Sequence, residues 1–515
     1  MKYKLTGVRV DLSAGGKHVV VLNRGDAKDL VLTQMDRVEL SKGDKKTSAI
    51  VDLTEKYIEK GEMGLFAEVA DKLDIKASAD VFLEPVDKPS SVDAIRKKID
   101  GVPLSKEEIG LIIDDLMEDK LSEVELSGLI LAWYIRGLTR DETLNLTKSI
   151  LHSGKILDFK RTPVMDKHCL GGVPGNRTTM LIVPVVASAG LLIPKTSSRS
   201  ISSPAGTADT MEFLARVDLN GEEIMRTVEK TNGCIAWGGA ADLAAADDKL
   251  IKIRHPLSLD PEGVMMASIL AKKRAVGATH VLIDIPIGHG AKVESEEQGE
   301  TLANQMMDLG SSLGMKIRCI LTPGYDPIGQ AVGPALEARE VLRILEGQKV
   351  SLDLMEKSIT MAGIILEMGG KARPGEGARL AQKILESGKA LEKMKEIIEC
   401  QGGNPEIAST DIEPGKYEET IKVDRDGRIR YADVKKIAKV ARIAGAPENK
   451  RAGLYLYVEK GDKVKKGQPL LTVYSETSSK LSAAMEIFEK IQPIEYEKVI
   501  LEEYSAENKP IVYKF

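Results

Sequence analysis

Short stretches of alternating apolar and polar residues dominate the first part of the chain, up to about residue 86. A period of two residues between Gly, Asp and Asn breaks is typical of β-strands with one buried face. The pattern therefore predicts a β-rich N-terminal domain over residues 1–86, followed by a linker at DKPSSVD. The segments that carry the pattern are KLTGVRVDL, KHVVVLN, LVLTQMDRVEL and DVFLEPV.

The pattern changes to a helical one from residue 91 to about residue 157. Three helix starts carry the spacing of a capping box, in which a hydroxyl and a carboxylate three residues later bind the first free N–H groups. An amphipathic segment such as EEIGLIIDDLMEDK follows. The sequence therefore predicts a compact helical domain. The three pairs are Ser105 with Glu108, Ser122 with Glu125, and Thr139 with Glu142.

After residue 162 the pattern becomes mixed α/β. Long apolar runs closed by polar or glycine-rich loops favour strands that are buried on both faces, with helices between them. From about residue 419 the pattern returns to strands, at AGLYLYVEKGDKVKKGQPLLTVYS. We therefore expect a multidomain α/β protein with a β-rich C-terminal α+β domain over 419–515. The apolar runs are MLIVPVVASAGLLIPKTSS, ATHVLIDIPIGHG and KIRCILTPG, and GVMMASILAKKRAVG is helical again.

Composition narrows the classes of function. The chain has 515 residues, which exceeds one hydrophobic core, and its net charge of −5 argues against a general nucleic-acid binder. Its four cysteines form no CxxC pair, and its six histidines show no metal-ligand spacing. There is no apolar signal region and no run long enough to span a membrane. We expect a cytoplasmic protein without a metal, a cofactor, a nucleic-acid partner or a membrane anchor.

Two glycine- and hydroxyl-rich segments suggest anion binding. In MDKHCLGGVPGNRTT, Lys167 and His168 run into glycines whose backbone N–H groups can approach an anion closely. A tight turn would use the same residues. In KTSSRSISSPAGTAD, from Lys195 to Asp209, hydroxyls and a guanidinium follow an apolar run, and such groups bind phosphate and ribose oxygens. The alternative is a polar, flexible loop.

Two further segments carry charge beside a predicted element. In RHPLSLDPEGVMMASILAKK, Asp260 is expected as a helix N-cap and Pro261 as the first helical residue. Ser268 and Lys272 follow at helical spacing, so the three side chains can share one face. In DIPIGHGAKV, Lys292 lies just after an apolar strand. Lys292 could reach a phosphate, or it could be solvated.

Together these motifs resemble one family. DKHCLGGVPG, SSRSISSPAGTADTME and SILAKK occur in the order, and near the spacing, found in the thymidine/pyrimidine nucleoside phosphorylase family. The resemblance covers about Ser91 to the C-terminus, and the N-terminal extension is similar to that of the archaeal, AMP-specific branch. It implies a helical domain (91–157 plus about 247–275) that faces an α/β phosphate-binding domain (162–246 plus 276–418) across a cleft. It also implies a homodimer or larger homo-oligomer.

The resemblance implies a role for each matching residue. It makes Asp260 the proton donor and places His168 near the base. It implies contacts with inorganic phosphate at Lys167, Ser197, Arg199 and Thr207, and base-side contacts at Arg254, Ser268 and Lys272. For the AMP-specific branch it implies nucleotide contacts at Gly172, Ser198, Arg199, Ser200, Ile201, Ser202, Ser203, Thr207, Ser268 and Lys292.

Two departures from the family pattern bear on the substrate. Cys169 stands where the family usually has a phosphate-binding serine, and a thiol is a weaker donor. Lys292 stands where nucleoside-specific relatives carry an apolar residue, so a second phosphate on the substrate would explain a cation there. The reaction implied is phosphorolysis of AMP, with CMP and UMP as further candidate substrates, to a free base and ribose 1,5-bisphosphate.

Three alternatives stay open at this point. A pyrimidine nucleoside phosphorylase would use the same chemistry on a substrate without the 5′-phosphate. A phosphoribosyltransferase similar to the anthranilate enzyme would need an acidic magnesium site, which the glycine-rich loop lacks. A nucleotide-binding regulator would keep the anion-binding loops without needing an acid. The choice among adenine, cytosine and uracil is not specified by the residues.

Overall fold

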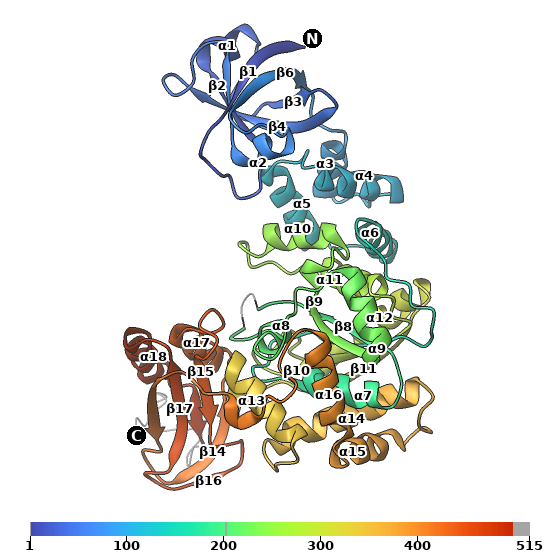
Figure 1. Cartoon of the computed structure of the whole chain (residues 1–515), viewed down its shortest axis with the longest axis vertical. Coiled ribbons are helices and arrows are strands. Elements are labelled where there is room, and N and C mark those ends of the chain that lie inside the picture. The colour runs from blue at the N-terminus through green and yellow to red at the C-terminus, as the bar shows by residue number, and fades with distance from the viewer. Residues whose placement is uncertain (1, 201–202, 498–515) are drawn as a thin grey trace, which may run out of the picture. The chain divides into compact units, whose positions relative to one another are not determined.

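The computed structural model describes residues 2–200 and 203–497, which fold into two compact units (Figure 1). Unit 1 contains residues 2–154 and 244–271. Unit 2 contains residues 155–243 and 272–497 as far as they are described. The chain therefore leaves unit 1 once, returns to it for a single segment, and completes unit 2 afterwards.

A closed six-stranded barrel forms the first part of unit 1, with the strand order β1-β5-β2-β4-β3-β6. The alternating sequence explains it, because every second side chain of β2, such as Val20 and Leu22, is fully buried in the barrel core. The elements are β1 (Tyr3–Arg9), β2 (Val19–Asn23), α1 (Arg24–Asp29), β3 (Arg37–Lys42), β4 (Lys45–Thr54), β5 (Glu62–Leu65), α2 (Ala67–Lys72) and β6 (Ser78–Val86).

Helices form the rest of unit 1. All three predicted capping boxes are present, since each hydroxyl accepts from the N–H of the carboxylate residue and each carboxylate accepts from the N–H of the hydroxyl residue. The helices are α3 (Ser91–Ile99), α4 (Lys106–Met117), α5 (Glu123–Arg136), α6 (Arg140–His152), α10 (Ala245–Arg254) and α11 (Glu262–Ala275), the last of which contains the boundary to unit 2.

One capping carboxylate also forms a buried ion pair. Glu142 accepts two bonds from the Nζ of Lys98, at 2.7 and 2.9 Å, and another from the N–H of Leu104. Both charged side chains are almost completely buried. Burial raises the pKa of Glu142, but these bonds and that from the Thr139 N–H outweigh it, so the pKa lies below its usual value. The pair fixes α3 against α6.

Parallel strands form the centre of unit 2. Strand β10 lies between β7 and β11, and β8 pairs with β9, all in parallel. A parallel bridge from Val164 to Leu192 joins the chain before β7 to the chain before β8. The carboxyl ends of these strands therefore point the same way. The strands are β7 (Met165–Cys169), β8 (Ile193–Ser197), β9 (Gly233–Trp237), β10 (His280–Ile287) and β11 (Lys316–Pro323).

One prediction was wrong. The apolar run MLIVPVVASAGLLIPKTSS was expected to be strand, but its first half belongs to helix α7 (Thr178–Ser188) and only its end forms β8. Helix α7 is buried on all sides from Thr178 to Ala187, so no polar face reveals its period of 3.6 residues. A continuous apolar run does not distinguish a buried helix from a buried strand.

Further helices contact the strands and α7. Helix α12 contacts β10 and β11, while α14, α15 and α16 contact α7. The buried apolar side chains of these helices, apart from α9 and α12, form one large core with α7. These helices are α8 (Thr207–Met211), α9 (Gly221–Thr231), α12 (Glu296–Ser312), α13 (Pro334–Leu345), α14 (Leu352–Met368), α15 (Gly377–Glu386) and α16 (Lys389–Cys400).

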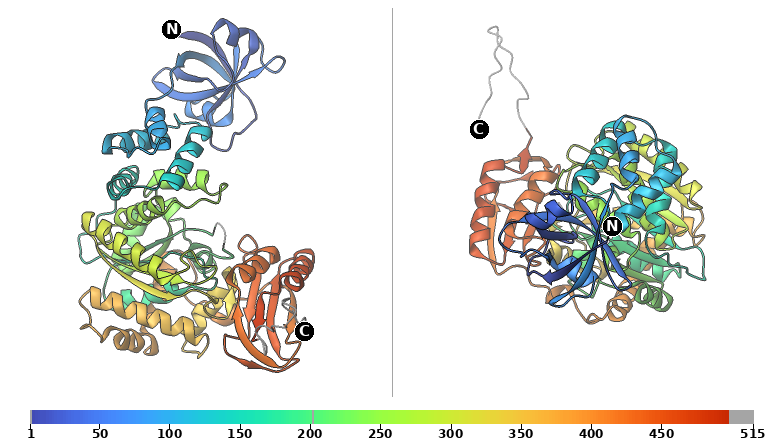
Figure 2. Two further views of the ribbon diagram at one scale, coloured as in Figure 1. Left: turned by 180° about the vertical axis from the view of Figure 1, so that it is seen from behind. Right: turned by 90° about the horizontal axis from the view of Figure 1, so that it is seen from above.

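The end of unit 2 has a second core built from short strands and two helices. Helix α17 contacts α18, β15 and β17, and α18 contacts β13 and β17, in the orange and red part of Figure 2. The elements are β12 (Ala331–Val332), β13 (Tyr417–Lys422), β14 (Gly427–Ala432), α17 (Val434–Ala444), β15 (Gly453–Leu456), β16 (Lys463–Val464), β17 (Pro469–Ser475), α18 (Ser478–Ile491) and β18 (Ile494–Tyr496).

No helix among the described residues combines the length and the apolar character that crossing a bilayer requires.

The buried pair in unit 1 gives a stability prediction. Glu142→Gln leaves the Lys98 ammonium buried without its counter-charge, so we expect the free energy of unfolding to fall by about 3 kcal/mol. The matched control is Glu108→Gln, at the same capping position of α4, whose partner Lys97 is 37% exposed. We expect it to lose less than about 1 kcal/mol in urea unfolding. The pKa of Glu142 is lowered in the folded protein, so acid that protonates Glu142 removes the stabilisation by the ion pair. The difference in free energy of unfolding between wild type and E142Q should therefore become smaller at acidic pH. Equal losses in the two variants would contradict this account.

Candidate active site

Three of the four predicted segments follow strands of one sheet edge in unit 2. The turn at 170–177 follows β7, the loop at 198–206 follows β8, and the turn at 288–293 follows β10. Because parallel strands end at the same edge, the topology brings these segments together. Ligands of open α/β sheets bind at such an edge.

The first and last of these segments touch through their backbones. Gly172 has a φ of +94°, and a Cβ there would lie 3.2 Å from the Cα of Ala291 and from the backbone nitrogen of Lys292. Only glycine fits both the backbone conformation and the close approach. The GGVPG turn therefore runs directly beside Lys292, whose side chain is exposed.

Lys167 lies deeper, in the middle of β7. Its Nζ donates to the Oγ1 of Thr178, the first residue of α7, at 2.8 Å, and the side chain is only 2% exposed. Burial lowers the pKa of Lys167, and the carboxylate of Asp284 on β10 opposes that shift. Asp284 also forms an ion pair with Lys357 at 3.0 Å. Lys167 therefore directs positive charge toward the turn that begins α7.

Cys169 holds the same turn in shape. Its sulfur accepts from the N–H of Gly171 at 3.4 Å and from the amide of Asn176 at 3.3 Å. Burial raises the pKa of the Cys169 thiol, so the group is protonated at neutral pH. In this structure Cys169 orders the glycine-rich turn through two weak hydrogen bonds.

A carboxylate closes the hydroxyl-rich loop after β8. One oxygen of Asp209 accepts from the N–H of Ser200 at 2.7 Å and from the N–H of Gly206 at 2.8 Å. The hydroxyl of Ser200 donates to the carbonyl of Ser203. Thr207 is half-buried at the start of α8, and Ser197 ends β8. Ser198 lies next in this loop, whereas the predicted contacts Ile201 and Ser202 lie outside the described residues.

Arg199 makes an ion pair that the sequence did not reveal. Its two terminal nitrogens donate to both oxygens of Glu212, at 2.7 and 2.5 Å, and its guanidinium lies 4.9 Å from the ring centre of Trp237. Lys450 forms a second ion pair with Glu212. The Arg199 guanidinium, with Lys450, holds the pKa of Glu212 at about 2. The loop after β8 is thus fixed to the end of β9 and to the region after α17.

His168 is the half-buried neighbour of Lys167 on β7. Burial lowers its pKa well below the usual value, and the charge of Lys273 lowers it further. The imidazole is therefore neutral at neutral pH and can offer one donor and one acceptor.

The predicted base-side residues Arg254, Asp260 and Ser268 lie in unit 1. The guanidinium of Arg254 forms an ion pair with the carboxylate of Asp260. Ser268 is buried, and its hydroxyl donates to Asp247 at 2.7 Å. Lys272, one turn further along α11, is half-buried.

The start of α11 differs by one residue from the expectation. The first helical hydrogen bond runs from the N–H of Met265 to the carbonyl of Pro261, so Pro261 occupies the cap position and α11 begins at Glu262. Asp260 therefore precedes the cap. Its carboxylate meets Arg254 because the turn between α10 and α11 brings them together.

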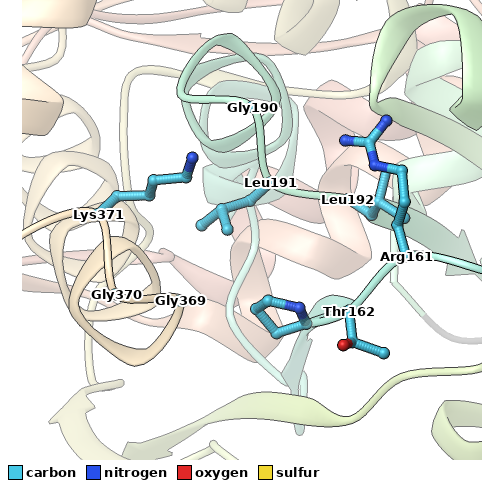
Figure 3. Close-up of a pocket in the computed structure, with 9 residues that line it drawn as sticks. Arg161, Thr162, Gly190, Leu191, Leu192, Gly369, Gly370 and Lys371 are labelled. Carbon is cyan, nitrogen blue, oxygen red and sulfur yellow. The ribbon is translucent and has the colours of Figure 1, made fainter.

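A separate cavity of about 340 Å³ opens at the amino ends of the strands (Figure 3). Its lining comes from the chain before β7, the turn after α7 and the end of α14, and includes the cations Arg161 and Lys371. None of the predicted site residues that the structure describes lines it. Within residues 2–200 and 203–497, no group of three or more His, Cys, Asp or Glu residues is placed to hold a metal ion.

Comparisons with known proteins match three successive stretches of the chain. Residues 92–154 match the helical bundle domain of the glycosyl transferase family, and residues 161–391 match the α/β domain of that family. Residues 428–495 match the pyrimidine nucleoside phosphorylase C-terminal domain. Along the chain, a stretch similar to the helical bundle domain is followed by one similar to the α/β domain and then by one similar to the C-terminal domain.

Curated relatives cover nearly the whole chain. The AMP phosphorylase of Methanococcoides burtonii is 46% identical over 95% of this chain and 96% of its own length. AMP phosphorylase 1 of Archaeoglobus fulgidus is 45% identical over 96% and 98%. Among solved structures, anthranilate phosphoribosyltransferase from Thermus thermophilus matches with a TM-score of 0.51 and 21% identity. It covers 60% of this chain and 99% of its own, which shows a shared fold.

The contact between Gly172 and the residue pair 291–292 gives a binding prediction. Gly172→Ala places a methyl group against that backbone, so we expect AMP to bind at least about tenfold more weakly. Gly171→Ala is the matched control, because its φ is +89° but a Cβ there meets nothing within 4 Å. Isothermal titration of both folded variants with AMP measures the difference. An equal loss in the two would show that backbone strain, and not the contact, is responsible.

Proposed function

The chain belongs to the AMP phosphorylases, and we propose that it cleaves AMP with inorganic phosphate to give adenine and ribose 1,5-bisphosphate. In this reaction the C1′–N9 bond of AMP breaks, an oxygen of phosphate bonds to C1′, and the departing base gains a proton. CMP and UMP are proposed as further substrates of the same chemistry. The protein is accordingly a pentosyltransferase.

The observation that carries the proposal is the backbone contact of the GGVPG turn with residues 291–292 at the carboxyl edge of the sheet. The GGVPG turn lies against the backbone of Lys292, and the hydroxyl-rich loop follows the neighbouring strand β8. AMP phosphorolysis requires two phosphate groups to be held on one ribose. A nucleoside phosphorylase has to hold only one phosphate group, the inorganic one. An exposed lysine beside the glycine turn would then have no second phosphate to bind.

In our proposal groups on β7, at the end of β8 and at the start of α8 hold inorganic phosphate. Lys167, Ser197 and Thr207 supply an ammonium and two hydroxyls, and each charge-assisted hydrogen bond contributes about 1.5–3 kcal/mol. Arg199 acts by fixing the loop through Glu212, since both of its terminal nitrogens donate there. Positioning phosphate against C1′ supplies several further kcal/mol of the barrier, on the order of 7 kcal/mol or more.

We propose that the nucleotide is held by the turn and loop residues around the ribose and its 5′-phosphate. Lys292 would pair with the 5′-phosphate, and Gly172 would permit its close approach. Ser268 is proposed to contact the nucleotide as well. The loop residues assigned to this role are Ser198, Arg199, Ser200, Ile201, Ser202 and Ser203.

Asp260 is the proposed acid that protonates the departing base. Positive charge develops on the sugar as the glycosidic bond breaks, and the ring nitrogen of the base gains electron density. A general acid contributes about 10²–10⁴-fold to such a step. Arg254, Lys272 and the neutral His168 are proposed to orient the base. Since Arg254 holds the Asp260 carboxylate here, that ion pair has to open and the carboxylate has to take up a proton from solvent before Asp260 can donate one to the base.

A product screen tests the proposed function. The purified protein with phosphate and AMP should yield adenine and a sugar bisphosphate by mass spectrometry. Parallel reactions with CMP, UMP, adenosine and thymidine rank the substrates. Turnover of nucleosides in place of nucleotides would identify a nucleoside phosphorylase. Ligand-dependent thermal stabilisation without any product would identify a nucleotide-binding regulator.

We expect Asp260→Asn to bind AMP normally and to lose about 10²–10⁴-fold in kcat, because the amide cannot donate the proton of a carboxylic acid. Glu262→Gln is the control, since this exposed carboxylate begins the same helix and has no proposed role. Steady-state rates and AMP titrations of both variants measure the effect. Near-normal turnover of D260N would remove Asp260 from the mechanism.

We expect Lys292→Ala to raise the KM for AMP by at least about tenfold while changing that for adenosine little, because only AMP carries the charge that Lys292 would pair with. The control is Lys371→Ala, which removes an exposed lysine that lines the cavity at the amino ends. The ratio of kcat/KM for AMP and adenosine is the readout. An equal loss for both substrates would show that Lys292 does not hold the 5′-phosphate.

A further inference from the structure

Two buried lysines share one carboxylate beneath the strand ends. Asp166 on β7 is fully buried, and its carboxylate lies 2.8 Å from the Nζ of Lys273 and 3.6 Å from the Nζ of Lys195. Lys195 and Lys273 are only 4% and 3% exposed. Lys195 lies two residues before Ser197, and Asp166 lies two residues before His168. The cluster therefore sits directly behind residues proposed to contact the substrates.

One carboxylate does not balance two buried ammonium groups. Like charges in a dry interior disfavour each other, so one of the two amines tends to lose its proton. Both amines approach this one carboxylate, at 2.8 and 3.6 Å, so two positive charges would repel each other at short range.

The surroundings single out Lys195 as the neutral amine. Lys273 has the shorter ion pair with Asp166, whereas the Nζ of Lys195 donates to the carbonyl of Thr196 at 2.6 Å. Burial and the charge of Lys273 lower the pKa of Lys195 well below its usual value. The titratable groups around Lys195 on the neighbouring elements are Asp166, Lys167 and His168 of β7, Cys234 of β9 and Lys273 of α11.

We propose that Lys195 is a positioning residue for the anionic substrates, which lacks its proton in the free protein and gains one when phosphate groups bind at the ends of β7 and β8. The lone pair of the amine takes the proton from solvent, and no other bond changes. The bound anion supplies the negative charge that Asp166 alone does not. The inference rests on the proposed function for the identity of the anion.

The sign of the pH dependence follows from the proton gained. Binding raises the pKa of Lys195 from its lowered value in the free protein, so binding takes up a proton at any pH between the two values. Within that window the affinity for phosphate falls as the pH rises, by up to about tenfold per pH unit. Below the window Lys195 is already charged, and the dependence disappears.

Calorimetric titration with inorganic phosphate at neutral pH tests the proposal on the full-length protein. Two buffers with different enthalpies of ionisation give the number of protons taken up on binding. We expect the wild type to take up about one proton more per site than Lys195→Met, since methionine has no amine to titrate. The protonation of phosphate itself is common to both proteins and cancels. Equal uptake by wild type and K195M would overturn the proposal.

Two further variants keep the test decisive if K195M does not fold. Lys273→Met leaves Lys195 and Asp166 as a balanced pair, so the extra uptake should vanish while phosphate still binds. Lys195→Arg stays charged at all accessible pH and should also lose the uptake but keep affinity. Lys371→Met, at the cavity of Figure 3, should behave as wild type. Persistent uptake in K273M would overturn the proposal.

The outcome is separable from that of the proposed function. The same preparations are assayed for release of adenine from AMP, and AMP serves as a second titrant. Turnover of AMP with equal proton uptake in all variants would count against the role of Lys195 alone. Lysine-dependent proton uptake without turnover would count against AMP phosphorolysis alone.

Discussion

Strand β7 places the buried Asp166 and Lys167 and the half-buried His168 and Cys169 within a parallel sheet, where apolar residues are the rule. A buried charge is tolerated only where opposite charges or hydrogen-bond partners compensate it, so the elements packed against this strand must supply such groups. Because side chains alternate across a strand, Asp166 and His168 point to one face of the sheet and Lys167 and Cys169 to the other. Lys273 and Lys195 meet the first face, while Asp284 and Thr178 meet the second. One five-residue strand thus organises two polar layers.

The turn after β7 and the loop after β8 lie next to these polar layers, and specific contacts hold each of them in place. The turn after β7 must pass beside the backbone of residues 291 and 292, so it needs Gly172, and Cys169 then holds its shape. The loop after β8 is held by Asp209 and by the ion pair of Arg199 with Glu212. Lys450 extends that ion pair to the C-terminal part of unit 2, which gives this part a role in shaping the loop.

Much of the fold could be predicted from the sequence where a local rule applies. The capping boxes at Ser105, Ser122 and Thr139 are local chemistry, and the strands of the barrel show their period directly. Helix α7 escaped because burial on all sides removes its period. The Asp166–Lys273–Lys195 cluster and the Arg199–Glu212 pair could not be predicted from the sequence, because the fold brings their members together and no local pattern reveals the contact. The charged residues of MDKHC, inside an otherwise apolar region, were the one sign in the sequence that a polar cluster surrounds this strand.

The barrel of unit 1 has a consequence for whatever meets its surface. Its ring of strands is closed within the described residues 3–86, so each strand already has a neighbour on both sides. An open sheet offers a row of unpaired backbone groups to an incoming peptide, and closure removes that mode of docking. Any molecule that binds this barrel must contact its outward side chains and connecting turns. Substitutions at those positions can therefore change which molecule binds while the backbone hydrogen bonds between the strands stay intact.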